Sequence, residues 1–127
     1  MLTVREIMKQ DLVAVPYRTS IAEVAGIMRQ RKIGSVFVKV DGKLIGIVTE
    51  TDIVRDVVGN NRSPASIHVE DVMSFPIVGI EERCQLTEAA DLMERHGTRH
   101  LAVTQAGQII GIVSVRDLLH PVSVDEF

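Results

Sequence analysis

The pattern of hydrophobic positions predicts one amphipathic helix in each half of the chain. In the first half, apolar residues stand at i, i+3, i+4 and i+7, namely Ile21, Val24, Ala25 and Met28. The same spacing recurs in the second half at Leu86, Ala89, Ala90 and Met93. This spacing places side chains on one face of an α-helix. Ser20 with Glu23 predicts a capping box for the first helix. Gln85, the equivalent residue before the second helix, offers no such cap. Gly97 is expected to end the second helix.

Alternating apolar residues predict strands on either side of each helix. A short strand is expected before each helix, over Leu12–Val15 and Ile77–Ile80. After each helix, two strands are expected around a hairpin turn, at Asp41-Gly42 in the first half and Ala106-Gly107 in the second. A final helix follows, with Ile53, Val54, Val57 and Val58 in the first half and Leu118 and Leu119 in the second. The predicted order is therefore β-α-β-β-α, twice.

The two halves are copies of one unit. Shifting the chain by 65 residues pairs Val4–Val57 with Val69–Val122 without a gap, and 15 of the 54 pairs are identical. The most faithful stretch is Gly46-Ile47-Val48-Thr49 against Gly111-Ile112-Val113-Ser114. Chance similarity between two apolar stretches would be scattered, so the duplication is real.

The duplication predicts an α+β fold in which two repeats pack about a pseudo-twofold axis. We expect repeat 1 over residues 1–60, a linker over residues 61–67, and repeat 2 over residues 68–127. A unit of under about 60 residues rarely closes a core alone, so the repeats are expected to share one. Two equivalent surfaces that meet about such an axis leave two equivalent clefts.

A motif recurs where the third strand of each repeat becomes the last helix. It reads Gly-Ile-Val-(Thr/Ser)-x-x-Asp, with Thr49 and Asp52 in one copy and Ser114 and Asp117 in the other. One interpretation is a helix cap, because a hydroxyl residue followed by an acid three residues later closes a helix N-terminus. The other is a nucleotide site. The helix start favours phosphate, the carboxylate can accept the hydroxyls of a ribose, and the glycine lets a ligand approach the strand.

The duplicated unit with this motif resembles a tandem pair of CBS domains, a Bateman module, from about Val4 to Val122. The resemblance implies that adenosine compounds bind in two clefts, to each of which both repeats contribute. One cleft would be built from Asp117 for ribose, Ser114 and Arg116 for phosphate, and Ile112, with an adenine wall from Leu12, Val13, Ile33, Gly34 and Ser35. The other cleft would be built from Asp52, Thr49, Thr51 and Ile47, with Ile77, Val78 and Thr98 opposite.

The two copies differ just before the second strand of each repeat. Basic residues often stand there in the family, and the second copy has Arg99-His100 where the first has Gly34-Ser35. We therefore expect the two clefts to be unequal and favour the one built on Asp117, with Arg99 and His100 as phosphate ligands. The neighbouring Arg95 and His96 are expected to form a solvated helix end.

Other functional classes have little support in the sequence. Cys84 has no histidine partner or catalytic signature, and Gly97 interrupts the helical spacing of His96 and His100, so neither a nucleophile nor a metal site is expected. A net charge of −3 and 3% aromatic residues argue against nucleic-acid binding. No apolar run approaches the ~20 residues of a membrane span. The paired methionines Met8, Met73, Met28 and Met93 are expected to fill the core or an interface.

The first helix of each repeat carries more apolar residues than one buried face needs, so we expect a second buried contact, in a homodimer. The leading hypothesis is a cytoplasmic, homodimeric, non-enzymatic module that senses an adenine nucleotide of the AMP, ADP or ATP type, with no catalytic cofactor. The alternatives are a scaffold with empty clefts, or a module that binds S-adenosylmethionine or NAD.

Overall fold

The computed structural model describes residues 1–119, so the predicted end of repeat 2 at residues 120–127 lies outside them. The chain forms two compact units. Unit 1 consists of Met1–Leu12 and Val78–Phe127, and unit 2 consists of Val13–Ile77. Each unit is an α+β structure built on its own three-stranded sheet.

Unit 2 contains the predicted elements of repeat 1. The order is β1 (Ala14–Pro16), α2 (Ile21–Arg31), β2 (Ser35–Val40), β3 (Lys43–Thr49), α3 (Glu50–Asp52) and η1 (Ile53–Val58), followed by the short 3₁₀ turns η2 (Pro64–Ser66) and η3 (Val69–Asp71). The sheet order is β1-β2-β3, with β1 parallel to β2 and β2 antiparallel to β3. The predicted last helix continues from α3 as the π-helix η1, in which the Gly59 N–H donates to the carbonyl of Val54, five residues earlier, at 2.7 Å.

Unit 1 repeats this arrangement in the second half of the chain. It contains α1 (Val4–Ile7), β4 (Gly79–Glu81), α4 (Leu86–His96), β5 (His100–Gln105), β6 (Gln108–Ser114) and α5 (Val115–Leu119). The sheet order is β4-β5-β6, with the same parallel and antiparallel pairings. Strands β1 and β4 begin two residues later than predicted, although the carbonyls of Val13 and Val78 already accept hydrogen bonds from the next strand.

The turns and caps are largely those that the sequence predicts. Both hairpin turns have two residues with positive φ, 50° and 79° in each, at Asp41-Gly42 and Ala106-Gly107, as a type I′ turn requires. The Ser20 hydroxyl accepts the N–H of Glu23 at 3.2 Å, Gln85 makes no side-chain cap, and α4 ends at Gly97 with φ of 61°. Local sequence therefore sets where these elements begin and end.

Each unit has its own aliphatic core between its sheet and its helices. The core of unit 2 consists of Val15, Ile21, Val24, Met28, Val36, Val38, Val48, Ile53, Val57, Ile67, Val69 and Val72. The core of unit 1 consists of Val4, Ile80, Ala89, Met93, Leu101, Val103 and Val113. Some of the surplus apolar residues of α2 are explained inside unit 2, because Ala25 and Ile27 pack against that core.

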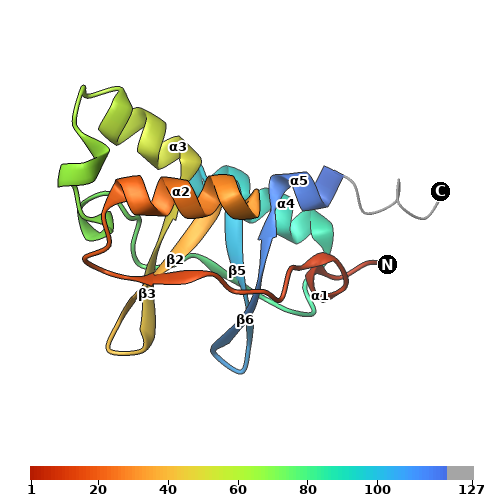
Figure 1. Ribbon diagram of the computed structural model, residues 1–127. Helices are drawn as coiled ribbons and strands as arrows, with labels where there is room; N and C mark the ends of the chain where they lie inside the picture. The colour runs from red at the N-terminus through yellow and green to blue at the C-terminus, as the bar shows by residue number, and fades with distance from the viewer. Residues whose placement is uncertain (120–127) are drawn as a thin grey trace. The chain divides into compact units, whose positions relative to one another are not determined.

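The short segment before each repeat packs on the sheet of the other repeat. Lys9 and Ile112 exchange two backbone hydrogen bonds of 2.9 Å, so the N-terminal segment lies beside β6 (Figure 1). In unit 2, Ser74 and Ile47 exchange the equivalent hydrogen bonds, at 2.8 and 3.0 Å, beside β3. The compact units of the structure are therefore not the same as the contiguous repeats of the sequence.

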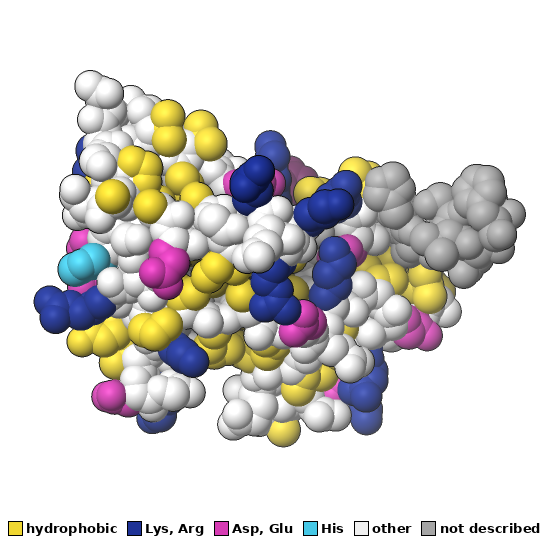
Figure 2. Space-filling view, in the orientation of Figure 1, with side chains coloured by type: hydrophobic (Ala, Val, Ile, Leu, Met, Phe, Trp, Pro, Cys, Tyr) yellow, Lys and Arg dark blue, Asp and Glu magenta, His cyan; other side chains and the backbone are white. Residues whose placement is uncertain are grey.

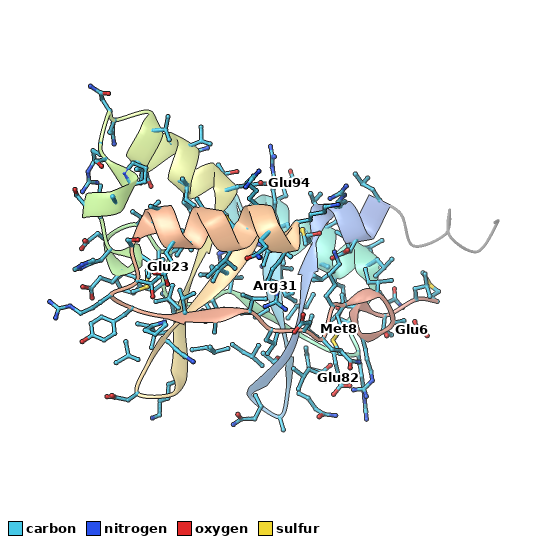
Figure 3. All side chains as sticks on the ribbon, in the orientation of Figure 1. Glu6, Met8, Glu23, Arg31, Glu82 and Glu94 are labelled. Atoms are coloured by element: carbon cyan, nitrogen blue, oxygen red, sulfur yellow. The ribbon has the colours of Figure 1, made fainter. Side chains whose placement is uncertain are left out.

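An ion pair between a buried carboxylate and a half-exposed arginine adds to the attachment of the N-terminal segment in unit 1. Glu82, labelled in Figure 3, is 4% exposed. Its carboxylate pairs with the guanidinium of Arg5, which follows the buried Val4. The Arg5 backbone N–H also donates to the Glu82 carbonyl at 3.1 Å. A carboxylate at this depth needs a cation partner, so Arg5 compensates for the burial of Glu82.

Candidate functional site

The motif residues of unit 1 form a capping box at the junction of β6 and α5. The backbone N–H and the hydroxyl of Ser114 donate to Oδ2 of Asp117 at 2.8 and 3.0 Å. In return, the Asp117 N–H donates to the Ser114 hydroxyl at 3.3 Å. The cap interpretation of the motif is therefore confirmed, and the cap uses one oxygen of the carboxylate.

Unit 2 has the same capping box at the junction of β3 and α3. The Thr49 N–H donates to Oδ2 of Asp52 at 2.9 Å, and the Asp52 N–H donates to the Thr49 hydroxyl at 3.2 Å. In both units the cap fixes the aspartate side chain and leaves Oδ1 outside it. Capping and ligand binding are therefore compatible, because they use different oxygens of the same carboxylate.

Lys9 lies at the capping box of unit 1 and was not among the residues predicted from the sequence. Its Nζ is 3.8 Å from Oδ1 of Asp117, the oxygen that the cap does not use. The Lys9 side chain is 62% exposed and the Asp117 side chain 14% exposed. The only signal in the sequence was the difference between the copies, because Ser74 occupies the position equivalent to Lys9.

Arg99 and His100 lie next to this capping box within unit 1. His100 pairs with Ser114 across β5 and β6, and the Arg99 carbonyl accepts the Val115 N–H at 2.9 Å. The Thr98 hydroxyl donates to the His100 carbonyl at 3.1 Å and shapes the entry into β5. The predicted basic pair thus belongs to the same unit as Asp117, and the strand pairing holds it beside the motif.

The other predicted site residues are divided between the two units. Unit 1 holds Leu12, Val78, Thr98, Ile112, Ser114, Arg116 and Asp117. Unit 2 holds Val13, Ile33, Gly34, Ser35, Ile47, Thr49, Thr51, Asp52 and Ile77. The strands place Ile112 and Ile47 two residues before the two capping boxes, where their backbones pair with Lys9 and Ser74.

The motif glycines have a structural role that differs from the predicted one. A Cβ at Gly111 would lie 2.5 Å from Sδ of Met8 and 3.0 Å from the Lys9 carbonyl oxygen. A Cβ at Gly46 would lie 2.6 Å from Sδ of Met73. Each glycine therefore admits the methionine of the segment that crosses the strand, so the expectation that the glycine opens space for a ligand was wrong. Figure 3 shows Met8 beside β6.

We define two equivalent half-sites at the capping boxes. The unit 1 half-site comprises Lys9, Arg99, Ser114, Val115, Arg116 and Asp117. The unit 2 half-site comprises the residues 65 positions away, namely Ser74, Gly34, Thr49, Glu50, Thr51 and Asp52. The unit 1 half-site carries three cations and one carboxylate, whereas the unit 2 half-site carries two carboxylates and no cation.

The position of Glu50 adds to the difference in charge between the two half-sites. Its backbone N–H donates to the Gly34 carbonyl at 3.0 Å. Its carboxylate lies against Gly34, because a Cβ on that glycine would be 2.9 Å from Oε1 of Glu50. The place that carries Arg99 in unit 1 is thus covered by a negative charge in unit 2, and an anionic ligand is favoured only by the unit 1 half-site.

Cys84 lies outside both half-sites, and its surroundings make it a poor nucleophile. The hydrogen bond with the Glu88 carboxylate raises the pKa of the Cys84 thiol, and burial and the charges of Glu88 and Glu81 raise it further. Since the thiolate is the reactive form, little of it is present at neutral pH.

Glu88→Gln is expected to speed the reaction of Cys84 with a disulfide reagent a few-fold at pH 8, because the variant lowers the thiol pKa. The reaction rate against pH measures this change, with the midpoint moving to lower pH. Glu94→Gln, on the same helix, is the matched control and should leave the profile in place. An unchanged profile for Glu88→Gln would contradict the assigned cause.

Two features of residues 1–119, the part of the chain that the structure describes, bear on other kinds of site. No cluster of three or more His, Cys, Asp or Glu side chains there has an arrangement suited to a metal ion. None of the helices in that part of the chain has the length and apolar character needed to cross a membrane.

Comparison with known proteins identifies the CBS domain family. The CBS domain family model matches residues 4–59 and again residues 69–123. An uncharacterized protein of Methanopyrus kandleri, MK0525, is 35% identical over 120 residues, which cover 93% of this chain and 61% of the relative. The CBS domain-containing protein YhcV of Bacillus subtilis is 30% identical over 118 residues, which cover 93% of this chain and 84% of the relative.

Solved structures of CBS-domain proteins also match this chain. A putative signal-transduction protein with CBS domains from Burkholderia ambifaria matches with a TM-score of 0.92 and 30% identity, over 99% of this chain and 97% of that one. A hexameric CBS-CP12 protein from bloom-forming cyanobacteria matches with a TM-score of 0.88 and 29% identity, over 99% of this chain and 75% of that one.

Proposed function

The chain belongs to the CBS-domain family and carries two copies of the domain, and from this premise we propose that it senses an adenine nucleotide of the AMP, ADP or ATP type. CBS-domain pairs are typically regulatory ligand-binding modules. In this proposal the ligand acts by binding one conformation of the module more tightly than another, without chemical change. The chain spans 61% of the length of the MK0525 relative.

The observation that carries the proposal is the unit 1 half-site. Asp117 is held by its cap through Oδ2, while Oδ1 remains for a ribose hydroxyl. The backbone brings three cations, Lys9, Arg99 and Arg116, to the same junction, where phosphate oxygens would accept charge-assisted hydrogen bonds. A carboxylate for ribose beside cations for phosphate is the chemistry that a nucleotide requires.

The proposed active form is a homodimer in the cytoplasm. Support for self-association comes from two valines on the outer surface of η1, since Val54 is 63% exposed and Val58 is 61% exposed. Figure 2 shows hydrophobic side chains at the surface over this helix. The two valines are four residues apart, so both expose apolar side chains on the same side of η1, where a second copy could cover them.

Calorimetric titration with AMP, ADP, ATP, S-adenosylmethionine and NAD tests the proposal. Asp117→Ala is expected to weaken binding of the best adenine nucleotide by about tenfold or more, because a hydrogen bond to a charged group is lost. Asp52→Ala is the matched control, since it removes the same cap in unit 2. Each variant should lose about 1 kcal/mol of folding free energy with its cap, which thermal unfolding measures.

The outcomes separate the candidate functions. Binding of no ligand by the unmodified chain would favour a scaffold, whose Asp52 and Asp117 serve only as caps. Nucleotide binding that Asp117→Ala leaves unchanged would overturn the site assignment. Tighter binding of S-adenosylmethionine or NAD than of AMP, ADP and ATP would replace the proposed ligand class.

A further inference from the structure

We propose that Lys9 makes the unit 1 half-site selective for phosphorylated adenosine over adenosine. In the free protein the Lys9 ammonium pairs with the Asp117 carboxylate, and when the ligand binds the ammonium pairs with the ligand's phosphate instead. This inference rests on the proposed function and adds a specificity-determining residue to it. Lys9 lies 108 positions from Asp117 in the sequence, and neither the repeat nor the motif includes it among the site residues.

The first step follows from the geometry of the Asp117 carboxylate. Oδ2 is committed to the Ser114 N–H and hydroxyl, at 2.8 and 3.0 Å. Oδ1 faces Nζ of Lys9 at 3.8 Å. Oδ1 is also the oxygen proposed to accept a ribose hydroxyl, so in the free protein an internal cation lies beside the place where the ligand's ribose is to bind.

The second step concerns how easily Lys9 leaves Asp117. The Asp117 side chain is only 14% exposed, but the Lys9 side chain is 62% exposed and its Nζ lies 3.8 Å from Oδ1, so solvent screens the ion pair and keeps it weak. The backbone at Lys9 stays fixed, because its N–H and carbonyl both pair with Ile112 at 2.9 Å. The ammonium can thus move by side-chain rotation alone, while its attachment point remains beside the half-site.

The third step concerns what Lys9 gains from each ligand. A phosphate group offers the displaced ammonium a new anionic partner, and charge-assisted hydrogen bonds to phosphate are strong. Adenosine displaces Lys9 from Asp117 but has no anionic group with which the ammonium could pair. Binding of a phosphorylated ligand is therefore favoured by the new contact with Lys9, which adenosine cannot make.

The second copy provides a natural comparison. Its aspartate, Asp52, has the same cap, but Ser74 replaces Lys9 and carries no charge. The backbone at that position is preserved, since Ser74 pairs with Ile47 as Lys9 pairs with Ile112. The two units thus share the same backbone arrangement and differ in the side chain that would bind the phosphate.

The test compares AMP with adenosine on Lys9→Gln, Lys9→Arg and the unmodified chain, by calorimetry. Lys9→Gln is expected to weaken AMP binding about tenfold, since a charge-assisted contact is lost. Adenosine binding should stay the same or become up to a few-fold tighter, because Oδ1 of Asp117 is released. Lys9→Arg should retain most of the preference for AMP. Thermal unfolding of each variant checks that this exposed position leaves the fold intact.

Arg83→Gln is the control for net charge. Arg83 is also an exposed cation of unit 1, and it follows β4, at the opposite edge of the sheet from β6. This variant should bind both ligands as the unmodified chain does. Raising NaCl from about 50 to about 500 mM should weaken AMP binding to the unmodified chain more than to Lys9→Gln, because salt screens the lysine–phosphate attraction.

Each result has a distinct meaning. Equal loss of AMP and adenosine binding in Lys9→Gln, or loss of neither, would overturn the role of Lys9 and leave the nucleotide site standing. If the unmodified chain binds none of AMP, ADP, ATP and adenosine, the proposed function is overturned, and this inference with it.

Discussion

Gly111→Val is expected to lower the free energy of unfolding by about 3 kcal/mol, through overpacking at a site that cannot relax cheaply. A Cβ at this position would lie 2.5 Å from Sδ of Met8 and 3.0 Å from the carbonyl oxygen of Lys9. The methionine side chain can move, but the Lys9 carbonyl is held by its hydrogen bond from the Ile112 N–H at 2.9 Å. The N-terminal segment must therefore shift away from β6.

Urea unfolding followed by circular dichroism measures this loss. Gly46→Val should behave similarly, because Met73 and the Ser74 carbonyl lie against Gly46 in the same way. Gly26→Ala is the contrasting control. It lies inside α2 with nothing within 4 Å of an added Cβ, so it is expected to gain about 0.5–1 kcal/mol from helix propensity. A Gly111→Val protein as stable as the parent would show that the N-terminal segment is not packed on β6.

Leu101→Ala is expected to cost about 3 kcal/mol of folding free energy, as large-to-small changes in a buried core do. Leu101 is fully buried, at 0% exposure, in the β5 strand of unit 1. It packs in a core of seven buried residues. The cavity that Leu101→Ala leaves in this core therefore removes a large share of the contacts that hold the sheet to α4. The surrounding strands limit how far the cavity can close.

The matched control for this prediction is the same change at an exposed leucine of the same unit. Leu119 is 71% exposed, so Leu119→Ala should alter stability by no more than about 0.5 kcal/mol. Val36, at the equivalent place in unit 2 and 1% exposed, should show a smaller loss than Leu101, because fewer atoms are removed. Similar stability for Leu101→Ala and Leu119→Ala would contradict the assigned core.

Features that depend on a few neighbouring residues were predicted well from the sequence. Each hairpin turn depends on two residues that adopt positive φ, and both turns lie where Asp41-Gly42 and Ala106-Gly107 stand. The capping boxes depend on a hydroxyl and an acid three residues apart, and both are present. Strand starts were less accurate, because β1 and β4 begin where pairing with the next strand becomes regular.

Features that depend on distant residues were missed. The role of Gly111 is set by Met8, which lies 103 positions earlier, and the sequence alone gave no reason to bring them together. For the same reason, the interpretation of the glycine as an opening for ligand was wrong. The ion pair of Glu82 with Arg5 belongs to this class as well.

The sequence by itself determined that this protein is one unit written twice, with the same order of elements and the same capped motif in each copy. Hydrophobic period, turn chemistry and caps are local properties, so they can be seen along the chain. Only the tertiary structure decided that each leading segment packs on the other repeat's sheet, which brings Lys9 to Asp117 and leaves Ser74 at Ile47. That choice depends on burial and strand pairing between residues far apart in the sequence, 103 positions for Lys9 and Ile112 and 27 positions for Ser74 and Ile47, which no local pattern encodes.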